Sequence, residues 1–216
     1  GSVRSPCTKN SLSEFTYIDA PYEVPPCVHS LESGIEGPAY TWMPFELSAE
    51  GANWEWFART PAAPSTRDED GGHDHNKTIE LITNVWHSRG PFDGIFGFSR
   101  GGAVAVALAA RICAGREEPA HIPLPGLRFL VLCAAYTPRE STSRRLLEDG
   151  VCKNLPTLHI FGEADQNVTP ERSRDLVRYF ADVESSPSEV WTHPGGHFVP
   201  SQCRKVLREF LVKNAL

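Results

Sequence analysis

The sequence of 216 residues predicts a single α/β domain, in which helices cover both faces of a mostly parallel sheet. Short runs rich in β-forming residues alternate with amphipathic stretches, which is typical of parallel strands joined by helices. Two of these runs, residues 127–136 and 155–161, are continuously apolar, as strands covered on both faces are. A hydrophobic content of 40% supports one sizeable core, so we expect one domain over residues 1–216.

The first third of the chain has the least regular pattern. Residues 15–19 (FTYID) predict a strand that ends before a proline. From residue 21 to about 77 the chain is rich in Pro, Gly and acidic residues without a clear period, which predicts a long, loop-rich insertion. The aromatic residues within this insertion are Tyr40, Trp42, Phe45, Trp54, Trp56 and Phe57.

Clearer elements follow the insertion. Apolar residues recur at helical spacing over residues 78–89, and Gly90-Pro91 ends that predicted helix. Residues 92–98 predict a short apolar strand. Residues 101–115 predict an alanine-rich helix that is apolar nearly all round, and such a helix belongs in the interior of a layered fold.

The second half of the chain continues the alternation. The segment 137–154, between the two apolar strands, is polar and contains one short predicted helix. Residues 170–180 predict a helix with proline in its first turn and Thr169 as its N-cap. Residues 188–192 predict the last strand, and residues 201–211 predict an amphipathic helix that closes the domain.

Charge and composition exclude several classes of partner. The formal net charge is −6, so the chain lacks the basic surface that binds nucleic acid or an anionic membrane. The longest apolar run, residues 103–110, is far shorter than the roughly 20 residues of a membrane-spanning helix. The six cysteines are scattered without a CxxC pair, so we expect reduced thiols in a cytoplasmic protein, with one or two surface disulfides as the alternative.

One short stretch raises the question of a metal. His73 and His75 flank Asp74, and imidazole and carboxylate groups are good ligands for several divalent ions. The surrounding residues are polar and rich in proline and glycine, which favours a solvated loop instead. We therefore predict no metal site.

The strongest chemical motif is Gly97-Phe98-Ser99-Arg100-Gly101, which fits the pattern G-x-S-x-G between a predicted strand and a predicted helix. Small residues are needed there because the serine occupies a sharp, strained turn that lifts its hydroxyl above the sheet. The stretch lacks the spacing of a dinucleotide-binding loop or a phosphate-binding P-loop. We therefore predict that Ser99 is a nucleophile and that the backbone N–H of Arg100 stabilises the developing oxyanion.

A serine hydroxyl needs an imidazole to take its proton, and a carboxylate to orient the imidazole. In this class of fold the three groups follow in the order Ser, Asp or Glu, His. Asp165 lies just after an apolar strand, where the active-site residues of α/β sheets collect. His197 lies in a glycine-containing loop after the last predicted strand. The sequence thus predicts a triad of Ser99, His197 and Asp165.

Three other residues compete for these roles. Glu163 shares the loop of Asp165 and offers a second carboxylate. Asp93 precedes the nucleophile strand, at its amino end, where no active-site residue is expected. His193 stands four residues before His197 and is the main rival base.

Five stretches carry a resemblance to a known family: residues 17–21 (YIDAP), 37–42 (GPAYTW), 90–102 (GPFDGIFGFSRGG), 156–165 (PTLHIFGEAD) and 194–200 (PGGHFVP). With these motifs the chain resembles the FSH family ("family of serine hydrolases"), a branch of the α/β-hydrolases, from about Tyr17 to the C-terminus. The resemblance implies an α/β-hydrolase fold, and it implies that Ser99, Asp165 and His197 match the family's nucleophile, acid and base.

The resemblance also bears on the substrate. The stretch 37–42 is similar to fungal members, some of which hydrolyse the thioester that holds a finished polyketide on its carrier protein, while other members are carboxylesterases. It implies a small acyl ester, or a carrier-protein or CoA thioester, as substrate, with no metal or organic cofactor. Tyr40, Trp42 and Phe198 are candidates for lining an acyl pocket. The alternative is a purely structural role, in which such aromatic residues pack as a hydrophobic support under a long loop.

One feature departs from the family pattern. Members normally begin with a strand and a His-Gly-type loop that supplies the second oxyanion donor, and nothing similar precedes Phe15 here. We expect a truncated or variant sequence in which the first strand and the oxyanion loop are missing. Two alternatives stay open: a catalytically impaired hydrolase fold used for binding, and an acyltransferase or peptidase on the same fold.

Overall fold

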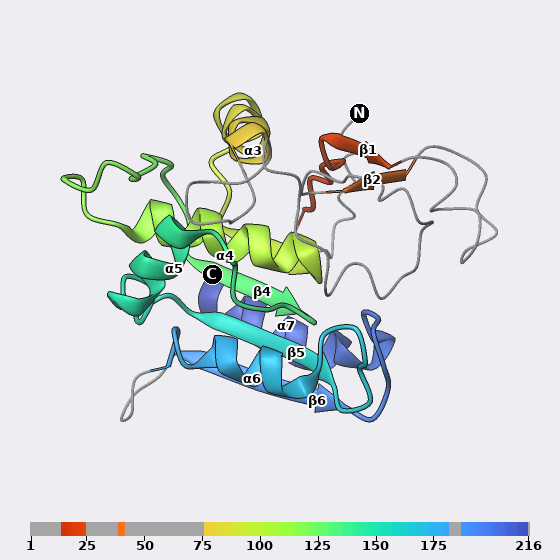
Figure 1. Ribbon diagram of the computed structural model, residues 1–216. Helices are drawn as coiled ribbons and strands as arrows, with labels where there is room; N and C mark the ends of the chain where they lie inside the picture. The colour runs from red at the N-terminus through yellow and green to blue at the C-terminus, as the bar shows by residue number, and fades with distance from the viewer. Residues whose placement is uncertain (1–13, 25–38, 42–75, 182–186, 216) are drawn as a thin grey trace, which may run out of the picture.

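The computed structural model describes residues 14–24, 39–41, 76–181 and 187–215, and Figure 1 shows their arrangement. Three predictions concern residues outside these ranges: the missing first strand, the role of Trp42, and the loop with His73 and His75. Most of the predicted insertion also lies outside them. The helices, strands and contacts named below all belong to the described residues.

The centre of the molecule is a four-stranded parallel sheet in which neighbouring strands follow one another along the chain. Its strands, in spatial order, are β3 (Gly94–Phe98), β4 (Phe129–Cys133), β5 (Thr157–Gly162) and β6 (Ser188–His193). Because all four strands run the same way, their carboxyl ends meet at one edge of the sheet, and the loops that follow them can share one site.

Helices join these strands and cover the sheet on both faces. The helices are α3 (Asn76–Arg89), α4 (Arg100–Cys113), α5 (Ser141–Glu148), α6 (Pro170–Val177) and α7 (Arg204–Ala215), and a 3₁₀ turn, Ser201–Cys203, leads into α7. In Figure 1, α6 and α7 lie on opposite sides of the sheet. Among the described residues, no helix combines the length and apolar character that crossing a bilayer requires.

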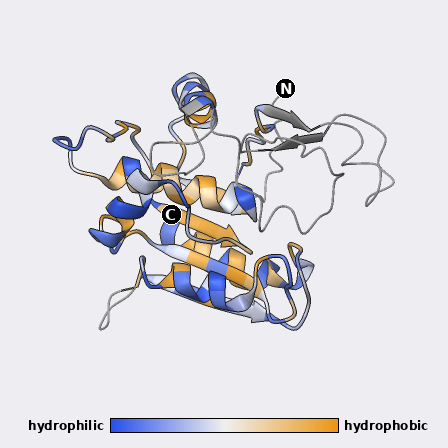
Figure 2. Ribbon diagram, viewed as in Figure 1, coloured by the Kyte–Doolittle hydropathy of each residue, from blue (hydrophilic) through white to orange (hydrophobic). Residues whose placement is uncertain are grey.

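The alternation of side chains along β4 explains the two layers. Leu130 and Leu132 pack with α4, α5 and α6 on one face of the sheet. Phe129 and Val131 point to the other face and pack with Phe210 of α7. All five residues of β4 are buried, and Figure 2 shows the central strands and α4 mainly in the hydrophobic colour. Each face therefore has its own apolar core.

Most sequence predictions for these elements are confirmed, and α4 is buried along most of its length, from Gly102 to Ala110. The predicted strand at residues 15–19 is wrong, because only residue 16 there forms a bridge. Instead β1 (Tyr22–Val24) pairs antiparallel with β2 (Ala39–Thr41). Alternation alone predicted the first strand, but a strand also needs a partner and a core, and the Tyr17 side chain is 58% exposed.

The helix expected over residues 170–180 is shorter and is capped differently. Proline stands at its first turn as predicted, but the Thr169 side chain makes no capping hydrogen bond. The backbone carbonyl of Thr169 accepts from the N–H of Arg172, at 3.0 Å, and so starts α6. The helix ends at Val177, after which tighter turns bury Phe180.

Candidate active site

Ser99 lies in the sharp turn between β3 and α4. Its φ of 52° is in the left-handed region, which few residues with a side chain adopt. The Ser99 N–H donates to the Cys133 carbonyl at 2.9 Å, and the Ser99 carbonyl accepts from the Ala103 N–H at 3.2 Å. These bonds tie the turn to both β4 and α4 and hold the strained conformation.

Glycine is required at position 97 because the chain crosses itself there. A Cβ atom at Gly97 would lie 2.6 Å from the Cα of Gly102 and 2.7 Å from the carbonyl oxygen of Gly101. Both contacts are far inside normal separation, and both involve backbone that cannot rotate away. The motif thus folds as the tight turn that its sequence predicts, with the Ser99 side chain at the carboxyl edge of the sheet.

The structure brings together the three side chains that the sequence singled out, although they are far apart in the chain. His197 Nε2 lies 2.9 Å from Ser99 Oγ, and His197 Nδ1 lies 2.7 Å from Asp165 Oδ2. An ionised carboxylate can only accept, so Nδ1 carries the proton and donates to Asp165. Nε2 is then left with a lone pair that can accept the Ser99 hydroxyl proton.

The Asp165 carboxylate is fixed on both of its oxygens. Oδ1 accepts from the backbone N–H groups of Asn167 and Val168, each at 2.9 Å. Oδ2 is therefore left for His197, and the Asp165 side chain is fully buried. This arrangement holds the carboxylate in one orientation toward the imidazole.

Backbone hydrogen bonds join the loop after β5 to the loop after β6, which brings Asp165 and His197 together. The N–H of Glu163 donates to the His193 carbonyl at 2.8 Å, and the N–H of Ala164 donates to the Gly195 carbonyl at 3.1 Å. A Cβ atom at Gly162 would collide with the Gly195 carbonyl oxygen, so only glycine allows this approach. The loop after β5 and the loop after β6 thus form one unit.

The three residues that compete for the roles of acid and base interact with other groups. Glu163 pairs with Arg174 through both carboxylate oxygens, at 2.8 and 2.6 Å. His193 is buried, and its Nδ1 accepts from the Gly195 N–H at 3.2 Å. Asp93 lies at the amino end of β3, where its carboxylate is 3.7 Å from Arg128. In the described structure, none of these side chains contacts Ser99 or His197 in place of the expected partner.

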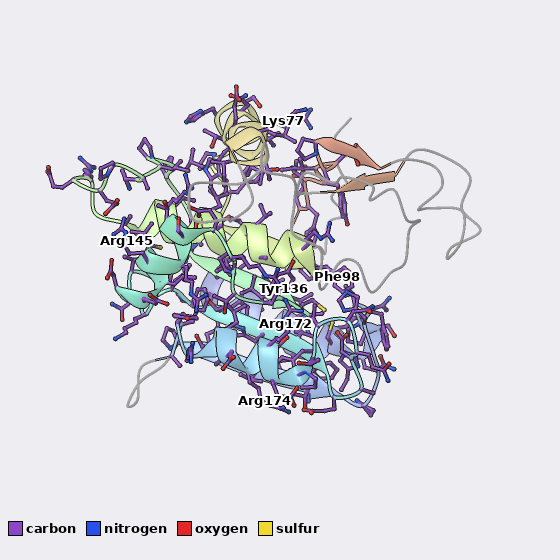
Figure 3. The ribbon with its side chains drawn as sticks, in the orientation of Figure 1. Lys77, Phe98, Tyr136, Arg145, Arg172 and Arg174 are labelled. Carbon is purple, nitrogen blue, oxygen red and sulfur yellow. The ribbon has the colours of Figure 1, made fainter. Side chains whose placement is uncertain are left out.

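An aromatic ring contacts the imidazole, and a thiol lies nearby. The rings of Phe98 and His197 have centroids 4.9 Å apart, and Figure 3 shows Phe98 beside the first turn of α4. Cys133 points to the same region, with Sγ 3.8 Å from the Phe198 carbonyl oxygen. Burial, with the nearby Cys203 and Asp165, raises the pKa of Cys133 to about 12. The thiol therefore stays protonated and does not compete with Ser99 as a nucleophile.

The structure describes the side chains or backbone of only some of the remaining candidate residues. Arg100 is the first residue of α4, and backbone N–H groups in a first helical turn point toward the N-terminal end, here toward Ser99. Phe198 follows His197, and its side chain is 47% exposed. Tyr40 lies in β2, but its side chain and all of Trp42 lie outside the part that can be described.

The cysteines and the potential metal ligands bear on disulfide and metal chemistry. Cys113, Cys133, Cys152 and Cys203 are free, whereas Cys7 and Cys27 lie outside the described residues. Within the described part of the chain, no group of three or more His, Cys, Asp or Glu side chains is placed to hold a metal ion.

Comparison with known proteins agrees with the resemblance seen in the sequence. The family model described as "Serine hydrolase (FSH1)" matches residues 1–208. Esterase OVCA2 of Danio rerio is 31% identical over 202 residues, which cover 92% of this chain and 82% of the relative. The chain belongs to this serine hydrolase family. Esterase OVCA2 of Homo sapiens is 29% identical over 197 residues, covering 88% of this chain and 77% of that protein.

Solved structures show the fold. Zea mays acyl-protein thioesterase 2 superposes with a TM-score of 0.61 at 18% identity, covering 93% of this chain and 80% of that one. Arabidopsis thaliana SOBER1 gives a TM-score of 0.53 at 16% identity, covering 90% and 80%. At these identities the likeness concerns the fold alone, and it confirms the predicted α/β-hydrolase architecture with its parallel sheet.

Several contacts at the site were missed by sequence reasoning. The backbone N–H groups of Asn167 and Val168 follow from an Asx-type turn, since an Asp side chain often accepts from the N–H two residues later. That signal was present in the stretch 165–168. The contact between the tilted rings of Phe98 and His197 joins residues that are far apart in the chain, and no local pattern predicts it.

Proposed function

We propose that the chain hydrolyses acyl esters or thioesters through Ser99, His197 and Asp165. The observation that carries the proposal is the continuous chain of contacts from Asp165 through His197 to Ser99, at 2.7 and 2.9 Å. The relatives named above as esterases, and the likeness to an acyl-protein thioesterase, support ester or thioester bonds as the target class.

In the first half of the reaction Ser99 Oγ attacks the acyl carbonyl carbon, and its proton passes to His197 Nε2. The imidazolium that forms is stabilised by Asp165, which keeps accepting from Nδ1. The carbonyl oxygen becomes a tetrahedral oxyanion, to which the N–H of Arg100 donates at the N-terminal end of α4. Collapse of this intermediate expels the alcohol or thiol, which takes the proton from Nε2 and leaves an acyl ester on Ser99.

In the second half His197 acts as a base again. It takes a proton from a water molecule, whose oxygen attacks the acyl carbon of the acyl-enzyme. The second tetrahedral intermediate releases the carboxylic acid, and Ser99 Oγ regains its proton from Nε2. Water supplies every atom that the products gain, so the reaction balances without a metal or an organic cofactor.

The substrate is a small acyl compound, and its acyl chain lies against the aromatic residues near the nucleophile. Phe198 supports this placement, because it follows His197 and about half of the residue is exposed. We extend the acyl pocket to Tyr40 and Trp42 as part of the same proposal. A thioester on CoA or on a carrier protein, including a polyketide carrier in a cytoplasmic pathway, is the narrower form of the proposal.

The test is a panel of p-nitrophenyl esters and matched thioesters of increasing acyl length. We expect hydrolysis by the unaltered chain, and a loss of at least about 10³-fold in kcat for both Ser99→Ala and His197→Ala. Ser88→Ala and His87→Ala are matched controls, because both residues are exposed on α3. These two variants should keep full activity.

The alternatives give different results in the same assay. If the folded chain turns over no substrate of the panel, the hydrolase proposal fails and a binding role is favoured. If added alcohol or amine captures the acyl group in preference to water, the chain is an acyltransferase with the same triad. Equal loss in the control variants would show that the alanine substitutions act on folding and not on chemistry.

A further inference from the structure

Three arginines lie close to Tyr136 or to one another at the carboxyl edge of the sheet. Arg100 directly follows Ser99, Arg139 lies three residues beyond Tyr136, and Arg172 lies in the first turn of α6. We call these four residues the arginine cluster. It adjoins the candidate active site but takes no part in the contacts among Ser99, His197 and Asp165.

The geometry of the arginine cluster is built around the Tyr136 ring. The Cζ atom of Arg172 lies 4.5 Å from the ring centroid, which is a cation–π contact. Figure 3 shows Arg172 on the side of α6 nearer to Tyr136, while Arg174 lies farther from it. Stacking holds the Arg172 guanidinium flat and leaves its N–H edge available for an in-plane partner.

The position of Arg172 is tied to the site itself. Ser173 Oγ donates to the Ala135 carbonyl at 2.9 Å, so the first turn of α6 is fixed against the residue before Tyr136. Arg172 Nη1 lies 3.4 Å from the carbonyl oxygen of Asn167, whose own N–H donates to Asp165. The loop that carries the acid of the proposed triad thus also contacts this guanidinium.

The surroundings of Arg172 and Arg100 disfavour their positive charge. Burial lowers the pKa of Arg172, and the charge of Arg139 lowers it further, while Tyr136 and Asp165 act in the opposite sense. Burial is also the largest influence on Arg100 and lowers its pKa. In the described part of the chain, neither Arg139 nor Arg172 forms an ion pair with a carboxylate.

The nearest carboxylates already have partners. Asp165 binds His197 and two backbone N–H groups. Glu140 follows Arg139 directly, but its oxygens accept from the N–H groups of Thr142 and Ser143 at the start of α5, and it also pairs with Arg111 at 3.4 Å. An acidic protein of net charge −6 therefore holds, near its proposed nucleophile, two arginines, Arg139 and Arg172, that form no ion pair with a carboxylate among the described residues.

We propose that the arginine cluster binds an anionic group of the substrate, so that the enzyme prefers acyl esters or thioesters that carry a carboxylate or a phosphate. The inference rests on the proposed function and narrows its substrate class. Guanidinium groups bind both anions through paired N–H donors, and the shared chemistry is a cluster of anionic oxygens. The anion belongs either to the acyl chain, as a terminal carboxylate, or to the leaving group, as the phosphates of coenzyme A do.

Two matched substrate pairs separate these sources. Mono-p-nitrophenyl glutarate against p-nitrophenyl butyrate adds a carboxylate to the acyl side. Butyryl-CoA against butyryl-N-acetylcysteamine adds phosphates to the leaving group. For each pair the ratio of kcat/KM, anionic over neutral, is measured in the unaltered chain and in Arg172→Gln, Arg172→Lys and Arg178→Gln.

We expect a ratio above one for one of the pairs, and a fall of about tenfold in that ratio in Arg172→Gln, with the neutral substrate little affected. Arg172→Lys should restore part of the ratio, and 0.5 M salt should lower it. Arg178→Gln is the control, since this arginine lies at the other end of α6 beside Asp175. It should leave both ratios unchanged.

The result that would overturn the inference is hydrolysis of the neutral substrates with ratios that Arg172→Gln does not change. Absence of hydrolysis of every substrate would instead overturn the proposed function, and the inference with it. A binding measurement independent of turnover keeps the two apart. Calorimetric titration of Ser99→Ala with butyryl-CoA and with glutarate should detect binding of one of them, and adding Arg172→Gln should weaken it about tenfold.

Discussion

At the scale of single residues, the proposed reaction depends on how Asp165 orients His197. One carboxylate oxygen accepts hydrogen bonds from two backbone N–H groups, and the other accepts from the imidazole. The carboxylate is therefore fixed, and it fixes the orientation of the His197 ring. Orientation decides the tautomer of the imidazole, and only the tautomer with its proton on Nδ1 can accept the proton of Ser99 at Nε2.

Asp165→Asn tests this role without disturbing the fold. The amide oxygen can keep accepting from Asn167 and Val168, while the amide NH₂ faces His197 and forces its proton onto Nε2. We expect kcat to fall by about 10⁴-fold at neutral pH, with the thermal unfolding midpoint nearly unchanged. Steady-state kinetics and calorimetric melting of the purified variant check both parts.

Glu163→Gln is the matched control, because it makes the same change on the other carboxylate of this loop. Glu163 faces Arg174 at the surface, so we expect a change in kcat well below tenfold. A larger loss in Glu163→Gln than in Asp165→Asn would reverse the assignment of the acid.

The residues of the proposed triad were predictable because each sits in a local motif. Ser99 stands in G-x-S-x-G, Asp165 follows an apolar strand, and His197 follows the last strand, so chain order and strand ends were enough. The arginine cluster was not predictable in this way. Its members come from separate segments, and only the packing of α6 against the end of β4 brings Arg172 to Tyr136.

At the scale of elements, the turn between β3 and α4 is the feature that positions the nucleophile. Its shape depends on the close crossing of Gly97 and Gly102, and on the bonds of Ser99 to β4 and α4. The sequence predicted the turn from its small residues. The sequence alone did not show which contact requires the small residues. The close approach of Gly97 to Gly102 exists only once the turn has folded.

Gly97→Ala should therefore damage the turn. The added methyl group would meet the Cα of Gly102 at 2.6 Å, so the backbone must shift and Ser99 must move. We expect a loss of stability of about 1–3 kcal/mol, and a fall in kcat of about 100-fold from the displaced nucleophile. Chemical denaturation and ester hydrolysis measure the two effects separately.

Gly115→Ala is the matched control, because Gly115 lies just beyond the far end of α4. A Cβ atom there meets nothing within 4 Å, and the backbone is outside the left-handed region. This variant should keep both stability and activity. If Gly97→Ala also kept both, the close crossing would have no bearing on the position of Ser99.

At the scale of the whole molecule, the parallel sheet positions the candidate site, because Ser99, Asp165 and His197 all follow the carboxyl ends of its strands. Its two faces are covered by separate apolar cores, one with α4, α5 and α6 and one with α7. The apolar runs and the alanine-rich helix predicted this layering correctly. The strand expected at residues 15–19 failed, because pairing is a property of the assembled sheet and not of one segment.

The core also contains one titratable group that links stability to pH. His159 is buried in β5, its ring packs on Phe180, and its Nε2 has no hydrogen-bond partner among the described residues. Burial lowers the pKa of His159 to about 3, whereas an exposed imidazole titrates near 6.5. Between these values the unfolded chain binds a proton at this site and the folded chain does not.

Stability should therefore be lost as the pH falls from about 6.5 toward 3, by up to about 1.4 kcal/mol per pH unit from this one group. Above pH 6.5 the imidazole is neutral in both states and the contribution is constant. We expect His159→Leu to flatten the dependence of the unfolding free energy on pH over this range, measured by urea denaturation at a series of pH values. The exposed His87→Ala should leave the slope unchanged, and an unchanged slope in His159→Leu would refute this origin of acid sensitivity.

The central claim, that Ser99 is an activated nucleophile in a hydrolase, is tested most directly by covalent labelling with a fluorophosphonate. The protein is treated at neutral pH, its intact mass is measured, and the labelled peptide is sequenced by mass spectrometry. We expect one added probe, located on Ser99, and no addition in Ser99→Ala or His197→Ala. Folded protein that stays unlabelled, or that carries the probe on a residue other than Ser99, would contradict the claim.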